Sequence, residues 1–329
     1  MPASFQAHAR NPKSHSTMSM PIKAVADQGI THPFGDHRSV KQAFPAAIPS
    51  EHSDPFLMCD YFDMVETTGR ARHDDDFPIA WHPHRGMDIA TYIRTGVGRH
   101  ADSLGNRETF DSPGLQWMSA GSGVEHAEGG ANDAGTHMQG FQIWINVPAD
   151  RKMDDPRYGT VPSKDLPLVA MGGGCGTALV LAGDALGVRG PFETVQDVQM
   201  IDFRVVKEAS LEFSISEGLD TAILYVYEGC LESVNGKSDI QAGSVILLDA
   251  GSDALRGLNV RTKGEDAGVM LFAGKKLREP IAWHGPIVMN TQEQIRTTLR
   301  ELRSGMFPPK RVDWDYKRMA AFPQNYVDS

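Results

Sequence analysis

The chain has 329 residues and a mass of 36.0 kDa, which fits two domains of middling size. Hydrophobic residues make up 40% and charged residues 22%, which excludes a wholly disordered chain and leaves enough apolar side chains for one or two cores. With 32 basic against 42 acidic residues the formal net charge is −10, which argues against direct binding to nucleic acid.

Cysteine usage and hydropathy bear on the compartment. The widely spaced Cys59, Cys175 and Cys230 form no CxxC pair and fit buried thiols in a reducing cytosol. No apolar run approaches the roughly 18 residues that a membrane span needs. Residues 1–21 lack the apolar core of a secretory signal, and we expect them to be mobile. These features predict a cytoplasmic protein that does not bind membranes.

Short alternating stretches predict strands in both halves of the chain. Residues 89–93 and 141–147 alternate with a period of two. In the second half, β-rich stretches recur at 178–183, 198–206, 211–215, 221–227, 244–249 and 268–274. Strands at this spacing, with turn residues between them, are typical of an all-β sandwich or barrel, and two such units in tandem account for the length.

The charged, proline-containing stretch 149–167 predicts a break between the two units. We therefore expect a first domain at 22–150, a linker at 151–167 and a second domain at 168–290. Residues 291–329 are predicted to form a short C-terminal helix followed by an extended arm lying on the body.

The predicted C-terminal helix has clear start and stop signals. Thr291 and Gln294 have the spacing of a capping box. Ile295, Leu299 and Leu302 then fall on one face, and Gly305 supplies the stop.

Two short motifs carry residues suited to metal chemistry. His82 and His84 flank Pro83, and His126 and Glu128 follow a glycine-rich turn. In an extended segment, residues i and i+2 point to the same face, so each motif presents two donors side by side. If neighbouring strands bring the pairs together, three imidazoles and one carboxylate converge and leave coordination positions open for a ligand.

This donor set, without thiolate, suits Fe(II), Mn(II), Ni(II), Co(II) or Cu(II), and Zn(II) is also compatible. The alternative is that each pair is a set of hydrogen-bonded polar groups, because a lone HxH or HxE is a weak signal. The remaining histidines of the first half lie in polar, loop-like surroundings and are expected to be exposed or structurally hydrogen-bonded. They are His8, His15, His32, His37, His52, His73, His100 and His137.

At these motifs the sequence resembles the pirin family. The likeness includes HPHRGMDIATYIRTG from residue 82, DSLGN at 102–106, SPGLQWMSAGSGVEHAE at 112–128 and GFQIWINVPADRKMDDPRY at 140–158. It continues through 181–188 and 277–291 and covers roughly residues 22 to 311.

The resemblance implies a bicupin, with two tandem jelly-roll-like β-barrels of which the first carries a single metal ion, usually iron. The family's ligands fall on His82, His84, His126 and Glu128. Cupins commonly have Glu where this chain has Asp88, which we interpret as a neighbour of the site. The second half has His284 as its only histidine and neither motif, so the resemblance implies a metal-free second barrel.

Several other side chains are candidates for the surroundings of the metal. An apolar rim that holds a flat substrate is predicted from Phe56, Trp81, Trp117, Met118 and Phe141, with core packing as the alternative for each. Arg85 is expected to pair with an acidic neighbour and orient its strand. Gln116 and Gln139 are candidates for contacts behind the ligands.

The resemblance implies two classes of function. In the first, the protein is an oxygenase similar to quercetin 2,3-dioxygenase, in which a flavonol or related enol or phenol binds the metal and reacts with dioxygen. Glu128 then acts as the catalytic base that takes the hydroxyl proton. In the second, it is a metal-dependent, redox-sensing partner of a transcription factor or metabolic enzyme, without significant turnover.

Overall fold

The computed structural model describes residues 18–29, 31–34, 37–65, 77–130, 135–252 and 254–317, with the backbone alone described at 31–34 and 37–39. The predicted mobile segment 1–21 is described only from residue 18. There, Ser19 bridges to Gly257 and Met20 is fully buried, so the end of this segment is fixed on the body.

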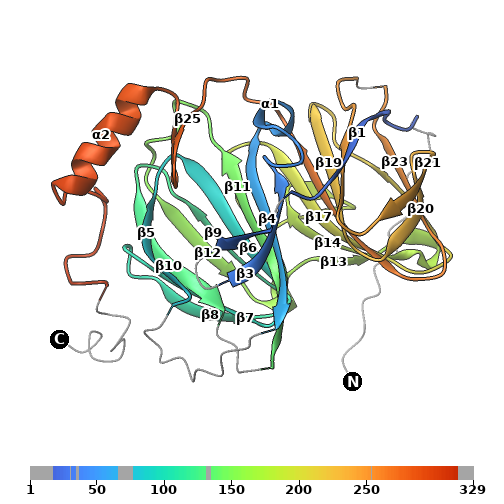
Figure 1. The fold of residues 1–329 in the computed structure, drawn as a ribbon, viewed down its shortest axis with the longest axis horizontal. Coiled ribbons are helices and arrows are strands. Elements are labelled where there is room, and N and C mark those ends of the chain that lie inside the picture. Colours follow the sequence, from blue (N-terminus) through green and yellow to red (C-terminus); the bar gives the residue numbers. More distant parts are fainter. Residues whose placement is uncertain are drawn as a thin grey trace.

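Two β-barrels lie side by side (Figure 1). In the first, a sheet of seven described strands runs in the order β12, β9, β6, β11, β4, β3, β2. These strands are β2 (Thr31–Phe34), β3 (His37–Phe44), β4 (Phe56–Val65), β6 (Met87–Thr95), β9 (Gly114–Ser119), β11 (His137–Asn146) and β12 (Arg157–Val161). Facing it is a sheet of four described strands in the order β5 (Ile79–His84), β10 (Val124–Gly130), β7 (Val97–Asp102) and β8 (Arg107–Asp111).

The second barrel repeats this plan. Its larger sheet orders seven described strands as β1, β22, β19, β24, β17, β14, β13. They are β1 (Ile22–Asp27), β13 (Leu168–Ala170), β14 (Gly176–Ala182), β17 (Val198–Val205), β19 (Thr221–Glu228), β22 (Ser244–Leu248) and β24 (Ala267–Gly274). The smaller sheet holds β18 (Ser210–Ser214), β23 (Gly257–Thr262), β20 (Cys230–Val234) and β21 (Lys237–Gln241). The predicted strands of both halves are confirmed.

The two larger sheets pack against each other through an aromatic layer. Tyr61 and Phe141 of the first barrel meet Tyr225 and Tyr227 of the second at ring-centroid distances of 5.5 to 6.0 Å. Beside this layer, the carboxylate of Asp202 accepts hydrogen bonds from the hydroxyls of Tyr92 and Tyr227. Apolar burial therefore joins the barrels, and these two buried hydroxyls are paired.

The predicted domain borders differ from the strand pairing at two places. Strand β1, assigned to the first domain at 22–150, pairs with β22 and so completes the second barrel. Within the predicted linker 151–167, β12 pairs with β9 along Arg157–Val161 and extends the first barrel. The first strand of the predicted first domain therefore belongs to the second barrel, and part of the predicted linker belongs to the first barrel.

The remaining described elements are short. They are α1 (Ser50–Ser53), η1 (Ser163–Asp165), η2 (Gly172–Gly174), β15 (Asp184–Ala185), β16 (Val188–Arg189), β25 (Ala282–His284), β26 (Ile287–Met289) and α2 (Gln292–Arg303). The predicted capping box at Thr291 and Gln294 is present at the start of α2. With 12 residues, α2 is the longest helix in the described part of the chain, and none there could cross a membrane.

The C-terminal elements return to the first barrel. Val288 donates its N–H to the carbonyl of Arg85 at 3.1 Å, which places β26 against the end of β5. A Cβ on Gly86 would collide with the carbonyl oxygen of Val288, and φ at Gly86 is +80°, so this close approach requires glycine. Beyond α2 the described part of the arm, residues 304–317, lies on the body with Phe307 and Tyr316 buried, and the predicted remainder falls outside the described residues.

Candidate metal centre

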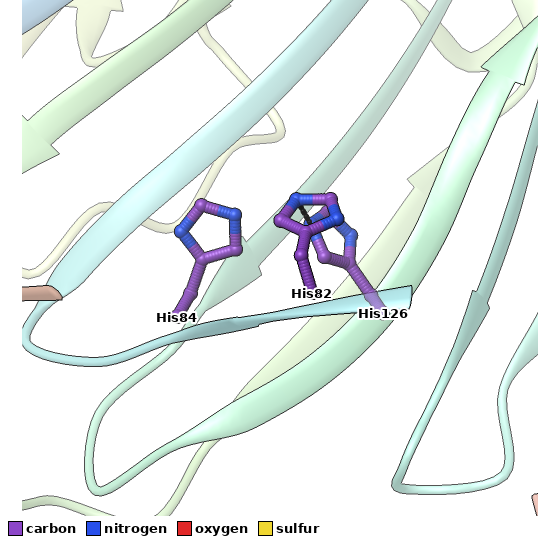
Figure 2. A group of neighbouring side chains, drawn as sticks. All are labelled: His82, His84 and His126. Atoms are coloured by element: carbon purple, nitrogen blue, oxygen red, sulfur yellow. Dashed lines mark hydrogen bonds between the residues drawn. The ribbon is translucent and has the colours of Figure 1, made fainter. Parts of the chain in front are cut away.

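Strands β5 and β10 bring the three motif histidines together (Figure 2). In their antiparallel register His126 lies opposite His82, and Val124 lies opposite His84. Since His82 and His84 are two residues apart on one strand, their rings share a face with that of His126. The ring centroids lie 4.3 to 4.9 Å apart, and each ring offers a nitrogen within 4.8 Å of the others.

The contacts of His82 fix the orientation of its ring. Its Nδ1 lies 2.8 Å from the carbonyl of Ala80. Because a carbonyl only accepts, Nδ1 carries a proton, and Nε2 is the ring nitrogen that can ligate a metal ion. That Nε2 lies 2.8 Å from Nε2 of His126.

Burial keeps the inner two histidines neutral. His84 and His126 are 1% and 0% exposed. Burial disfavours the imidazolium, and the neighbouring His82 adds to this, so the pKa of each lies well below its ordinary value. Neutral imidazole is the form that ligates a metal ion.

These residues fit a divalent transition metal. Neither ring nitrogen of His84 has a hydrogen bond of normal geometry, although the carbonyl of Pro286 approaches the ring closely enough to oppose the fall in its pKa. The 2.8 Å between the Nε2 atoms of His82 and His126 is close to the roughly 3 Å that separates two nitrogens bound at right angles to one ion. An orphaned buried imidazole and a close nitrogen pair are what a metal would satisfy.

Glu128, the fourth predicted ligand, lies at the edge of this group. Its Oε1 is 3.9 Å from Nε2 of His126, and it shares a set of donors within 4.8 Å with His126 and His100. Gln142 donates its amide to Oε1 at 3.2 Å. The hydroxyl of Thr91 lies 3.1 Å from Oε2 and 2.7 Å from the amide oxygen of Gln142, so its one proton is shared between the two acceptors. These contacts from the facing sheet hold the buried carboxylate beside the histidines.

His100 is placed differently from the expectation of a loop-like, polar surrounding. It lies on β7 inside the barrel with no exposed surface, and its Nδ1 is 3.5 Å from Nδ1 of His126. Its Nε2 hydrogen-bonds to Asp102 at 3.1 Å, so the structural hydrogen bond that was the other expectation is present. Strand β10 pairs with β5 on one side and with β7 on the other. His126 on β10 therefore lies between the histidines of β5 and His100 of β7.

The predicted rim is not gathered around the histidines. Phe56, Trp117 and Phe141 face the other way, into the core between the barrels, because residues of alternate parity on a strand point to opposite faces. Trp81 lies on the outer side of β5, 5.3 Å from the ring of Tyr316. Met118 is buried in a cluster with Trp144, whose ring lies 5.1 Å from His84. Trp144 is thus the aromatic neighbour that the sequence did not single out.

Arg85 pairs with an acidic neighbour, as predicted. Its guanidinium reaches Glu301 at 2.6 Å and Thr298 at 2.7 Å, both on α2. The residue is 2% exposed, so a buried ion pair ties the metal-binding strand to the C-terminal helix.

The other predicted neighbours lie away from the three rings. Gln139 hydrogen-bonds to Tyr61 at the seam between the barrels, and Gln116 is buried on β9. Asp88 accepts a hydrogen bond from the N–H of Val195 in the second barrel at 2.7 Å.

Of the remaining histidines, His52, His137 and His284 are exposed, and His137 pairs with Asp63 at 2.5 Å. His8, His15 and His73 fall outside the described residues, as do the side chains of His32 and His37.

Comparison with known proteins assigns a family to this arrangement. The family model described as Pirin matches residues 37–145, and that of the Pirin C-terminal cupin domain matches 200–308. A pirin-like protein of Caulobacter vibrioides is 33% identical over 88% of this chain and 100% of its own length. A Pseudomonas aeruginosa protein named "Putative quercetin 2,3-dioxygenase" is 32% identical over 84% of this chain and 94% of its own.

Among solved structures, quercetin 2,3-dioxygenase from Acinetobacter baumannii superimposes with a TM-score of 0.79 at 27% identity. The match covers 88% of this chain and 99% of that one. The expected architecture of two cupin barrels is confirmed, and the chain belongs to the pirin family.

Proposed function

We propose that the protein is a metal-dependent oxygenase of the quercetin 2,3-dioxygenase type, acting on a flavonol or a related enol or phenol. The observation that carries the proposal is the convergence of three imidazoles, two of them fully buried, beside a buried carboxylate in the first barrel. The names and structures of its relatives point to the same chemistry.

In this proposal His82, His84 and His126 hold one divalent transition metal ion, with Glu128 as a further ligand or close neighbour. Iron(II) is the proposed ion, and Mn(II), Ni(II), Co(II), Cu(II) and Zn(II) suit the same donors. Bound there, the ion supplies Lewis acidity toward the substrate hydroxyl and dioxygen. We place the protein in the cytosol, as the cysteine pattern predicts.

Glu128 is the proposed base. Its carboxylate is contacted by Thr91 and Gln142, and among the described residues no lysine or arginine forms an ion pair with it. It can therefore take the proton of a substrate hydroxyl that approaches the histidines. Thr91 and Gln142 hold the carboxylate in place while the proton moves.

The space next to Glu128 is small and mostly apolar. A cavity of about 30 Å³ is lined by Glu128, Thr91 and Gln142 on one side and by side chains such as Phe62 and Met138 on the other. A flavonol is much larger than this space, so it enters there only when these side chains move apart. An apolar wall keeps bulk water from the reacting group.

The small cavity also favours a second candidate function. A protein that binds a metal but admits no large substrate could instead be a metal-dependent partner of another protein, such as a transcription factor or metabolic enzyme. The net charge of −10 points to a protein partner rather than to DNA.

Oxygen uptake distinguishes the two functions. The protein is loaded anaerobically with Fe(II), and then with each alternative ion, before quercetin or a smaller enol is added in air. We expect uptake that matches substrate loss and that falls by about 100-fold or more in Glu128→Gln, with metal content unchanged. No uptake with any ion and substrate, alongside full metal content, would reject the oxygenase and leave the binding function.

A further inference from the structure

We infer that His100 and Asp102 are positioning residues that hold His126 in its metal-binding tautomer. The inference rests on the proposed metal site but not on any particular reaction there. It starts from these two side chains of β7, the strand that pairs with β10 on the side opposite β5, which carries His82 and His84.

The hydrogen-bonded series runs from Asp102 through His100 to His126. The carboxyl of Asp102 accepts three further hydrogen bonds. Its Oδ1 accepts the N–H groups of Leu104 and Asn106 at 2.9 and 3.0 Å, and its Oδ2 accepts the side-chain amide of Asn106 at 2.8 Å. Each of these contacts points an N–H at a carboxyl oxygen, so Asp102 acts as an acceptor toward its neighbours. The 3.1 Å contact between Oδ2 and Nε2 of His100 therefore requires the proton to be on Nε2.

The next step passes from His100 to His126. In the tautomer with its proton on Nε2, His100 presents the lone pair of Nδ1 to His126, whose own Nδ1 lies 3.5 Å away. His126 then donates from Nδ1, and its Nε2 keeps the lone pair. That Nε2 is the atom that faces His82.

The stack around His100 fixes the ring that makes both contacts. The ring of Tyr158, on β12, lies parallel to that of His100 at a centroid distance of 4.6 Å and an angle of 24°. His100 and Asp102 are both fully enclosed, so no water competes for these bonds. The result matches the general pattern in which a metal-bound histidine donates its second N–H to a fixed partner.

The same residues allow a competing arrangement. His100, His126 and Glu128 themselves offer donors within 4.8 Å of one another. A second ion in this group would need the lone pair of His126 at Nδ1, the atom that the positioning role assigns to a proton. The two arrangements therefore exclude each other at one atom.

Zinc binding to the full-length protein tests the inference, because Zn(II) is diamagnetic and needs no turnover. Asp102→Asn places an amide donor opposite His100, and His100→Leu removes both contacts. We expect each variant to bind Zn(II) about 10- to 100-fold more weakly than the wild type, with one ion per chain in the wild type.

Two further variants separate positioning from packing. His100→Gln offers an amide oxygen toward His126 and an N–H toward Asp102, and we expect it to restore most of the affinity lost in His100→Leu. Asp184→Asn, an exposed carboxylate of the second barrel paired with Arg189, serves as the matched control and is expected to bind zinc as the wild type does.

Nitrogen-15 NMR of the histidine rings supplies the second readout. The expected spectrum of the zinc-loaded wild type shows His126 protonated at Nδ1 and metal-bound at Nε2. Zinc affinity that is unchanged in both Asp102→Asn and His100→Leu would overturn the inference. So would a spectrum in which Nδ1 of His126 carries no proton. Binding of two zinc ions by the wild type, with one of them lost in His100→Leu, would also overturn it. A wild type that binds zinc in this way but consumes no oxygen with any ion in the uptake assay would instead reject the proposed reaction alone.

Discussion

The two barrels share one architecture but fill their interiors differently. The small sheet of the first barrel turns His82, His84, His126, Glu128, His100 and Asp102 inward. The small sheet of the second turns in Leu211, Phe213, Leu231, Val234, Ile240, Leu258 and Val260. One scaffold thus supports a buried polar centre in one copy and an apolar core in the other, so the chemistry depends on a few inward positions and not on the fold.

The difference between the two barrels can be tested by removing His82, the least buried of the three proposed histidine ligands. His82→Ala removes one of three imidazoles from the mouth of the first barrel, where the side chain is only half-buried. We expect metal content to fall from one ion per chain to near zero while the circular dichroism spectrum stays that of the wild type. A variant that retains a full complement of metal would show that the three histidines are not the site.

The second barrel should respond in the opposite way. Leu258→Ala deletes a core side chain that is 1% exposed, and we expect the free energy of unfolding to fall by about 2 to 5 kcal/mol. Metal content should remain that of the wild type, measured by elemental analysis beside denaturant unfolding. Loss of metal in this variant would show that the barrels are not independent in function.

The seam between the barrels gives a pH-dependent contribution. Burial raises the pKa of Asp88 from 3.8 to about 6, against the opposing effects of Val195, Ser119, Arg157 and Arg151. The folded state then binds the proton more tightly than the unfolded state. Stability contributed by this group is therefore present below about pH 4 and is lost as the pH rises through about 6.

The loss amounts to about 3 kcal/mol, since one pKa unit is worth about 1.4 kcal/mol. It should show as a difference between the wild type and Asp88→Asn, whose neutral side chain does not titrate, when both are unfolded in denaturant from pH 4 to pH 7. A difference that stays constant across this range would mean that the carboxyl is not held in an apolar setting.

The smallest expected effect concerns the helix docked on the first barrel. Thr291→Ala removes the side-chain cap that accepts from the N–H of Gln294 at 3.2 Å, and we expect a cost of about 1 kcal/mol in unfolding free energy. Thr297→Ala, on the same helix, is the control without a cap. Equal stability of the two variants would show that the cap contributes nothing measurable.

Local signals in the sequence were sufficient for the elements and for the ligand pairs. Period-two alternation predicted the strands, and the spacing of Thr291 and Gln294 predicted the start of α2. The i, i+2 spacing placed His82 and His84 on one face. All of these depend on neighbours a few residues apart.

Long-range pairing escaped prediction. Nothing in residues 22–27 indicates that β1 completes the second barrel, because strand partners are chosen across more than 200 residues. His100 and Asp102 repeat the i, i+2 spacing of the ligand pairs, which is the one signal that could have marked them. For Phe56, Trp117 and Phe141 core packing, the alternative to a rim, is what the structure shows, and the composition of a strand does not reveal which face meets the second barrel.

Anomalous diffraction from crystals loaded anaerobically with Fe(II) tests the central claim most directly. We predict a single strong iron peak at about 2.1 Å from Nε2 of His82, Nε2 of His126 and one ring nitrogen of His84. An iron peak elsewhere in the chain, or no peak between these three rings at full iron content, would contradict it.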